Sequence, residues 1–207
     1  MKYSITRTLA TAVVLTMALT AIVPVVQAGV LPGEDAPDFT LPDTNGKDHT
    51  LSKYLKDGKT VVLEWFNPDC PFIVKHHVKH KTMNESYAKV KDHDVVWLAI
   101  NSNAEGKQGY GLERNQKAVK EYDIPFPVLM DPSGKVGHLY GAKTTPHMFV
   151  ITPDGKVVYN GAIDDNRSPT DLGDSNYVLL ALDDLMQGNA VQEAETKPYG
   201  CSVKYAK

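Results

Sequence analysis

The stretch TVVLEWFNPDCPFIVKHH, residues 60–77, carries the local signals that decide the fold. Its first part, Thr60–Phe66, is a continuous apolar run rich in β-branched and aromatic residues, which predicts a central strand covered on both faces. Pro71 stands where helices favour their first residue, and helical periodicity continues to about Val90. Cys70, one of 2 cysteines in the chain, is therefore expected where a strand turns into a helix.

A cysteine in that position has the surroundings of a reactive thiol. The free N–H groups of a first helical turn and the positive end of the helix dipole stabilise a thiolate. Lys75, His76 and His77 add positive or titratable groups nearby, whereas the carboxylate of Asp69 opposes ionisation. Most lone cysteines are buried structural residues, but this position between an aspartate and a proline favours a reactive one.

The segments on both sides of this stretch predict alternating strands and helices. Residues 36–55 have the pattern of an N-terminal β-hairpin that turns at Asn45-Gly46 and is followed by a short helical piece. The pattern after the helix at Pro71 predicts, in order, a strand at 95–102, a helix within 103–123, a strand at 126–131, a hairpin at 147–163 and a helix at 175–188. We therefore expect an α/β fold with a central mixed β-sheet flanked by helices, a βαβ half being followed by a ββα half.

The first 28 residues predict export. Two basic residues, Lys2 and Arg7, precede an uncharged apolar stretch that ends in small residues, which is the layout of a secretory signal peptide spanning residues 1–28. A retained transmembrane anchor is the alternative. Pro24 and Gln27 dilute the apolar run, however, and no basic stop-transfer cluster follows it.

The rest of the chain has the length of one compact domain, at residues 29–190, followed by a polar tail at 191–207 that carries Cys201. Cleavage would change the formal net charge from −3 to −5, because the removed residues include two basic and no acidic side chains. A mildly acidic surface argues against nucleic acid or an anionic membrane as the partner. We expect a periplasmic or secreted protein without a stable membrane anchor, in a compartment where a disulfide bond is permitted.

The chain resembles the thioredoxin superfamily, in the redoxin (AhpC/TSA, peroxiredoxin-like) branch that includes peroxiredoxins and exported TlpA/ResA-like thiol–disulfide oxidoreductases. Residues 36–55 look like the N-terminal extension of that branch, and VVLEWFNPDC is similar to the strand that leads into its redox motif. TTPHMFVITPDGKVVYNGAI, residues 144–163, looks like the segment with the cis-proline and the following hairpin. The ending ETKPYGCSVKY, together with GAIDDNRS, resembles an exported bacterial subgroup. The resemblance implies a thioredoxin-like fold.

The resemblance also implies roles for individual residues. Cys70 takes the attacking position of the CxxC motif, and Glu64 matches the buried acid that moves protons for the thiols. Pro146 matches the cis-proline that faces the sulfur, and Thr145 would supply backbone groups to an extended substrate. His147 is expected near the sulfur, where substrate binding and simple packing are both open. Glu64 could also be an ordinary surface residue, but an acid inside an apolar strand is unfavourable to bury without a purpose.

Three positions depart from the relatives. Ile73 replaces the second cysteine of the CxxC motif, so a short-range disulfide is excluded. Asn67 stands where peroxiredoxins have Thr or Ser, and it is the candidate for contacting the substrate there. Peroxiredoxins also have an arginine about where Pro146 falls. Arg114 or Arg167 could replace it, although the sequence places neither near the cysteine.

Cys201 leaves three interpretations open. Its neighbours KPYGCSVKY are typical of an accessible loop, so it could be a resolving cysteine that attacks an oxidised or mixed-disulfide Cys70. It could instead form a static disulfide, which would close a loop of about 130 residues and stabilise the fold by roughly 4–5 kcal/mol. It could also remain unpaired, because sequence does not fix connectivity.

The histidines behind Cys70 raise a metal hypothesis. A regular helix from Pro71 would bring His77 and His80 near the cysteine, a grouping similar to Sco-type copper chaperones. That family has a second cysteine before the proline, which this chain lacks. The simpler expectation is that Lys75, His76, His77 and their neighbours form a solvated basic helix face.

The leading hypothesis is an exported thiol-dependent oxidoreductase. Cys70 would attack protein or small-molecule disulfides, Glu64 would assist proton transfer, and Cys201 would resolve the intermediate with electrons from a thiol donor. The first alternative is a peroxiredoxin-like hydroperoxide reductase, and the second is a Cys/His metal-handling module. No organic cofactor is expected, because no Gly-rich phosphate loop follows a strand.

Overall fold

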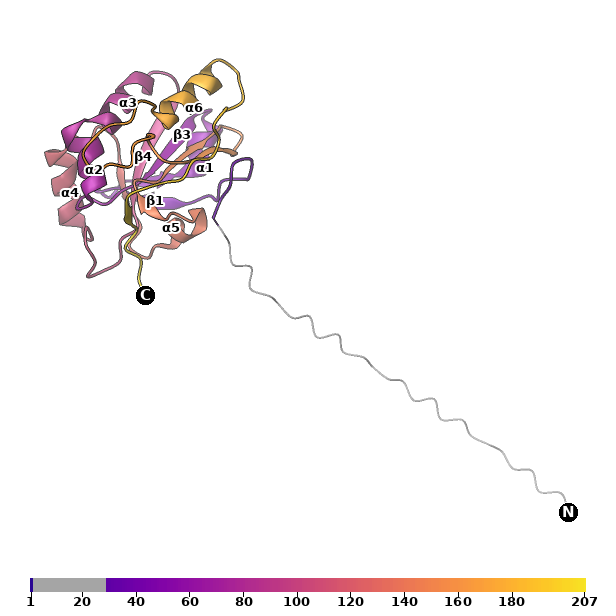
Figure 1. The fold of residues 1–207 in the computed structure, drawn as a ribbon. Coiled ribbons are helices and arrows are strands. Elements are labelled where there is room, and N and C mark those ends of the chain that lie inside the picture. The colour runs from indigo at the N-terminus through magenta and orange to yellow at the C-terminus, as the bar shows by residue number, and fades with distance from the viewer. Residues whose placement is uncertain (2–28) are drawn as a thin grey trace.

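A computed structural model describes Met1 and residues 29–207, and the signal-peptide prediction falls on residues 2–28, outside the described part. At the centre is a five-stranded mixed sheet (Figure 1) with the order β5-β4-β3-β7-β8. β3, β4 and β5 are parallel, whereas β7 is antiparallel to β3 and β8 is antiparallel to β7. The prediction of a mixed sheet is therefore confirmed. The five strands are β3 (Thr60–Trp65), β4 (Val95–Asn101), β5 (Val128–Met130), β7 (Met148–Ile151) and β8 (Val157–Gly161).

The predicted N-terminal hairpin is also present. β1 (Thr40–Pro42) pairs with β2 (Asp48–Thr50), and α1 (Leu51–Lys56) follows at once. The carboxylate of Asp43 accepts the N–H groups of Asn45 and Lys47 at 2.7 and 3.0 Å, which closes the turn. The turn thus takes its shape from a side chain as well as from the Asn-Gly pair.

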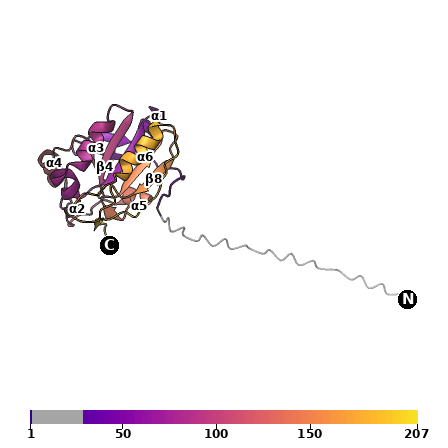
Figure 2. The same cartoon turned by 45° about the horizontal axis from the view of Figure 1, so that its top comes forward.

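Alternation along β3 creates two cores. Val62 and Phe66 face one core with helices α2 (Pro71–Val74), α3 (Thr82–Val90), α4 (Leu112–Glu121) and α6 (Tyr177–Met186). Val61, Leu63 and Trp65 face the other core with α1, the hairpin and α5 (Lys135–Tyr140), a helix that the sequence pattern did not predict. Figure 2 shows these helices around the sheet. In the described part of the chain, no helix combines the length and the apolar character needed to cross a bilayer.

The predicted continuous helix from Pro71 to about Val90 is wrong in its middle. After α2 the chain forms a π-helical turn, η1 (Lys75–Lys79), in which the N–H of His80 donates to the carbonyl of Lys75 at 3.1 Å. Lys81 then adopts a left-handed conformation (φ 52°), and α3 begins at Thr82. Single π-helical turns are rare and are found frequently at functional sites, and in η1 the side chains of Lys75, His76 and His77 are buried.

The C-terminal tail is packed, contrary to the expectation of an accessible loop around Cys201. β9 (Cys201–Ser202) pairs antiparallel with β6 (Thr144–Thr145). Tyr199 and Val203 are buried on either side of β9, and the ring of Tyr205 stacks on His138 of α5 at 4.0 Å. The tail therefore crosses the molecule and ends beside α5 (Figure 1).

Candidate active site

Cys70 lies at the predicted strand-to-helix junction and is fully buried. It is the N-cap of α2 in an extended conformation, and the N–H of Val74 donates to its carbonyl at 3.0 Å. Its Sγ donates to the carbonyl oxygen of Thr145 at 3.0 Å, and the Thr145–Pro146 peptide bond is cis. The thiol thus faces the cis-proline loop, and it rests as a hydrogen-bond donor.

Asn67 shapes the loop that holds this cysteine. Its side-chain oxygen accepts the N–H of Asp69 at 3.0 Å, and its carbonyl accepts the N–H of Cys70 at 3.0 Å. A Cβ on Gly109 would lie 2.0 Å from that side-chain oxygen, so only glycine fits there. Nδ2 of Asn67 is buried without a hydrogen-bond partner among the described residues. This amide is the donor that a substrate-binding role of Asn67 would use.

Arg114, from α4, reaches the same loop, whereas Arg167 lies on the tail side near Tyr199. Nε of Arg114 donates to Asp69 at 2.8 Å, and Nη2 of Arg114 donates to the carbonyl of Pro68 at 3.3 Å. The hydroxyl of Tyr122 donates to the same carbonyl at 2.7 Å. The charge of Asp69 is therefore compensated, and it opposes a thiolate less than the sequence alone implied.

Glu64 is fully buried on the face of β3 that points toward the core of Cys70. One carboxylate oxygen lies 2.7 Å from Nε2 of His77, and the other accepts the indole N–H of Trp97 at 3.2 Å. Nδ1 of His77 is buried without a partner in the described part of the chain. The surface alternative for Glu64 is wrong, and the structure provides a buried acid–imidazole pair in place of a free acid.

His147 is held by the scaffold through both ring nitrogens. Nδ1 accepts the N–H of Lys143 at 3.2 Å, and Nε2 lies 2.7 Å from the side-chain oxygen of Asn160. Burial lowers the pKa of His147 to about 4, although the hydrogen bond to Asn160 partly offsets this effect. The imidazole is neutral near pH 7 and positions the segment that follows Pro146. A role in substrate binding stays a prediction.

Cys201 lies against Cys70. The β6–β9 register places Cys201 opposite Thr145, whose carbonyl is the acceptor of the Cys70 thiol. Partial burial raises the pKa of Cys201 from 9.0 to about 11, and the hydrogen bond and charge of Cys70 add to this rise. Both cysteines are free thiols in this structure. The two sulfurs come together although 130 residues separate them in the sequence.

The residues behind Cys70 form a buried polar cluster that the sequence did not reveal. The ammonium group of Lys75 has no solvent exposure and donates to the carbonyl of Asn166 at 2.7 Å and to the hydroxyl of Tyr199 at 3.2 Å. It also lies 3.3 Å from the carboxylate of Asp164. An ammonium has three protons, so all of its donors are satisfied. Burial lowers the pKa of Lys75, and the charge of Asp164 opposes this effect.

Tyr199 connects this cluster to the tail. Its hydroxyl donates to Asp164 and accepts from Lys75, and Nε2 of His76 lies 3.0 Å away. Burial lowers the pKa of His76 to about 3, so the ring is neutral, and with the proton on Nε2 it is a second donor to the tyrosine oxygen. We call these four residues, Lys75, His76, Asp164 and Tyr199, the latch. They fix the tail two residues before Cys201.

The latch corrects the expectation of a solvated basic helix face, because Lys75, His76 and His77 are all fully buried. The Lys75 ammonium group and Nε2 of both histidines contact residues that lie far away in the sequence or on another element, which no local pattern reveals. It also explains part of the segment DDNRS, residues 164–168, in which Asp164 and the carbonyl of Asn166 hold Lys75. Among the described residues there is no group of three or more His, Cys, Asp or Glu side chains placed to hold a metal ion.

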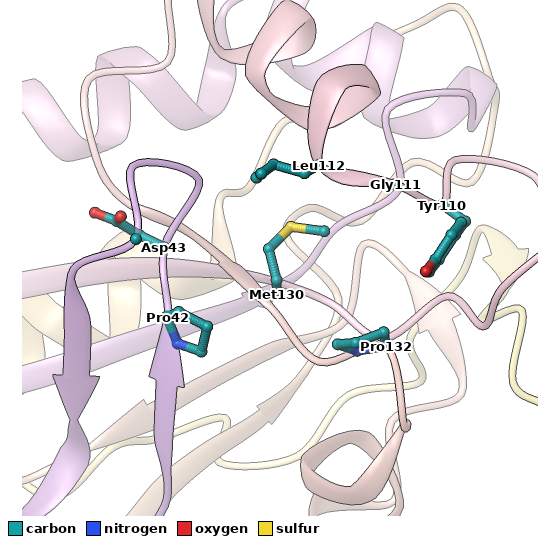
Figure 3. A pocket seen from close by; sticks show the side chains of 8 residues that line it. Pro42, Asp43, Tyr110, Gly111, Leu112, Met130 and Pro132 are labelled. Atoms are coloured by element: carbon teal, nitrogen blue, oxygen red, sulfur yellow. The ribbon is translucent and has the colours of Figure 1, made fainter.

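An apolar pocket of about 280 Å³ lies apart from the two cysteines, between the N-terminal hairpin and the start of α4 (Figure 3). Leu112 on its rim is about half exposed. The lining contains neither cysteine and no residue of the latch. The lining residues are Pro42, Asp43, Gly46, Tyr110, Gly111, Leu112, Met130 and Pro132.

The model of the AhpC/TSA family matches residues 32–160, which contain Cys70, Glu64 and the cis-proline loop. The chain belongs to the AhpC/TSA family. The thiol-disulfide oxidoreductase ResA of Bacillus subtilis (strain 168) is 36% identical over 126 residues, which are 61% of this chain and 64% of that protein. The chain spans just under two thirds of the length of the curated relatives it matches first.

Solved structures share the fold of this chain. A hypothetical protein of Sinorhizobium meliloti 1021 superposes with a TM-score of 0.77 at 28% identity, covering 86% of this chain and 96% of that one. The thioredoxin domain of a thiol-disulfide oxidoreductase of Bacteroides vulgatus gives a TM-score of 0.52 at 21% identity, covering 64% and 89%. The fold is thioredoxin-like, as the sequence resemblance implied.

The latch predicts a strong effect of Asp164→Asn. The substitution keeps the shape but leaves the Lys75 charge buried without a counter-charge, so the free energy of unfolding should fall by roughly 3–5 kcal/mol. Asp94→Asn is the control, because it breaks the Lys59–Asp94 pair, whose side chains are 36% and 78% exposed. The control should lose much less stability, because solvent screens the charges of an exposed pair. Urea unfolding of both variants measures the difference, and equal losses would contradict a buried ion pair.

His147 predicts a pH dependence of stability. Its pKa is 6.5 in the unfolded chain and about 4 in the fold, so between these values only the unfolded state takes up the proton. Stability should therefore fall as the pH falls through this window, by up to about 1.4 kcal/mol per pH unit from this residue. In His147→Gln this part of the slope should disappear. In the control His93→Gln, at an exposed histidine, the slope should match the wild type.

Removing Cys70 and removing the Lys204 charge should change the pKa of Cys201 in opposite directions. In Cys70→Ala the pKa of Cys201 should fall below about 11 yet stay above 9.0, because burial is the larger cause and remains. In Lys204→Gln it should rise, because the Lys204 charge favours the thiolate. The rate of Cys201 alkylation against pH, read by peptide mass spectrometry, gives both values. A pKa unmoved by Cys70→Ala would show that the thiols do not interact.

Proposed function

We propose that this protein is an exported thiol–disulfide oxidoreductase in which Cys70 is the nucleophile and Cys201 the resolving cysteine. The observation that carries the proposal is the β6–β9 register, which holds Cys201 opposite Thr145 while the thiol of Cys70 donates to that residue's carbonyl. Membership of the AhpC/TSA family and the similarity to ResA support the same chemistry.

The reaction has two exchange steps. The Cys70 thiolate attacks a substrate disulfide, forming a bond from Cys70 to one substrate sulfur and releasing the other as a thiolate that takes up a proton. The thiolate of Cys201 then attacks the sulfur of Cys70 in this mixed disulfide. The second substrate sulfur leaves as a thiol, and Cys70 and Cys201 are joined. The substrate has gained two electrons, and an external thiol donor restores the two cysteines.

The raised pKa of Cys201 suits this order of events. While Cys70 is a free thiol or thiolate, its hydrogen bond and charge help to keep Cys201 protonated. Once Cys70 is in a mixed disulfide, that thiolate charge is gone and the pKa of Cys201 falls. Cys201 then becomes the better nucleophile only when there is an intermediate to resolve.

The buried pair of Glu64 and His77 is proposed to move the protons. The carboxylate lies 2.7 Å from the imidazole, so a proton can pass between them without large movement. His77 adds a second titratable group to the acid that the family resemblance predicts. The pair lies in the same core as Cys70, between β3 and the turn η1.

The proposed setting is extracytoplasmic. We propose cleavage of a signal peptide at residues 1–28, a domain at 29–190 and a functional tail at 191–207, in a periplasmic or secreted protein without a stable membrane anchor. An oxidising compartment supplies disulfide substrates. Protein and small-molecule disulfides are the proposed substrates, and hydroperoxides are the alternative.

The central prediction is a Cys70–Cys201 disulfide formed during turnover. After one equivalent of oxidised substrate, peptide mapping without reductant should find this bond in the wild type. Cys201→Ser should accumulate a mixed disulfide on Cys70. Cys70→Ser should form neither the mixed disulfide nor the Cys70–Cys201 disulfide. Insulin disulfide reduction with a thiol donor should be lost in Cys70→Ser.

Two outcomes would replace this proposal. Consumption of hydroperoxide with a thiol donor, without turnover of insulin disulfides, would make the protein a peroxidase. Stoichiometric copper or zinc retained through purification, and lost in Cys70→Ser, would make it a metal-handling module.

A further inference from the structure

We propose that residues Tyr199–Tyr205 are a strap that occupies the strand-accepting edge beside Cys70 and closes the site to other substrates until it is displaced. This inference rests on the proposed function only in taking Cys70 as the reactive group. The strap is a part of this chain bound where an extended substrate would bind. We therefore infer that access to the thiol is controlled by the opening of the tail.

The first observation is the contact between the strap and the cis-proline loop. β9 forms an antiparallel ladder with Thr144–Thr145, and Cys201 is the residue opposite Thr145. A partner peptide that pairs with this edge would need the same backbone groups. The edge is therefore already filled, and the occupant places a cysteine next to the reactive thiol as a substrate would.

The second observation is the close approach of Gly200. A Cβ at this position would lie 2.2 Å from the carbonyl oxygen of Thr145 and 2.8 Å from its carbonyl carbon. That oxygen is the acceptor of the Cys70 thiol. Gly200 also has a φ of 138°, which other residues adopt rarely. The strap therefore lies directly over the hydrogen bond of the nucleophile, at a distance that only glycine permits.

The third observation is the anchoring of the strap at both ends. Before β9, Tyr199 is held in the latch by Lys75, His76 and Asp164. After β9, the N–H of Val203 donates to the carbonyl of Lys143 at 3.1 Å. The N–H of Lys204 donates to the side chain of Asn103 at 3.0 Å, and the hydroxyl of Tyr205 donates to the carbonyl of Ala142 at 2.9 Å. The two-residue strand is thus fixed from both sides.

The consequence is visible at Cys70, which has no solvent exposure. A thiol in that state reacts with an external disulfide only after the strap opens. Because the strap is tethered, it competes as an intramolecular ligand, and a substrate must overcome its effective concentration. The observed affinity for substrate is reduced by the fraction of molecules that are open.

The test measures the accessibility of Cys70 directly and needs no turnover. In a Cys201→Ser background, Gly200→Ala should push the strap off Thr145, and the alkylation of Cys70 by iodoacetamide should become faster. We expect at least about a tenfold increase, which corresponds to about 1.4 kcal/mol in the opening equilibrium. Gly188→Ala is the matched control, because Gly188 also has a positive φ (75°) but has no atom within 4 Å of the added Cβ. The control should alkylate at the background rate.

A second variant protects the test against misfolding. Deletion of residues 201–207 removes β9 but keeps Tyr199 and the latch, and it should also accelerate the alkylation of Cys70. Circular dichroism confirms that each variant is folded. The proposal of a strap is overturned if Cys70 in the folded deletion variant is alkylated at the background rate. It is also overturned if Gly188→Ala accelerates the alkylation of Cys70 as much as Gly200→Ala does. Absence of insulin disulfide reduction by the wild type would refute the proposed function. It would leave the comparison of Cys70 alkylation rates unaffected.

Discussion

The ammonium group of Lys75 is the point on which the arrangement of the site depends. A buried positive charge is tolerable only when each of its protons has an acceptor, and the three acceptors here come from Asp164, Asn166 and Tyr199. One side chain thus ties the turn η1, which follows α2, to the loop after β8 and to the C-terminal tail. Because losing any acceptor would leave a charge in the core, these three segments are held together as a unit.

The local patterns of the sequence predicted most of the scaffold. The apolar run at β3, the Asn-Gly turn of the hairpin and the proline after Cys70 each act over a few residues, so they could be read without the fold. The cis-proline followed from the family resemblance. The interruption of the helix near His80, by contrast, accompanies contacts between the side chains of η1 and residues far away in the sequence, such as Asn166 and Tyr199. Lysine and histidine side chains are seldom fully buried, so the composition of this segment predicts a solvent-exposed face where the structure has a buried one.

Cys201 shows the same limit from the other side. Its neighbours are polar and contain proline and glycine, which is typical of an exposed loop. The glycine in fact serves a close backbone approach to Thr145, and Tyr199 is a buried anchor. The same residues are compatible with an exposed loop and with a packed strand. Only the strand register separates them, and register is set by tertiary contacts rather than by a two-residue strand.

The loss of the second CxxC cysteine and the presence of the tail are two parts of one arrangement. In a CxxC motif the second sulfur is fixed one helical turn away, so it is always available. Here Ile73 fills that place, and the second sulfur lies on the extended strand β9, which pairs with β6. If Cys201 resolves the intermediate as proposed, docking and resolution are coupled, because the β6–β9 pairing that aligns Cys201 also covers Cys70. In the proposed mechanism, a substrate that opens the strap also removes Cys201 from reach, and the mixed disulfide persists until the tail returns.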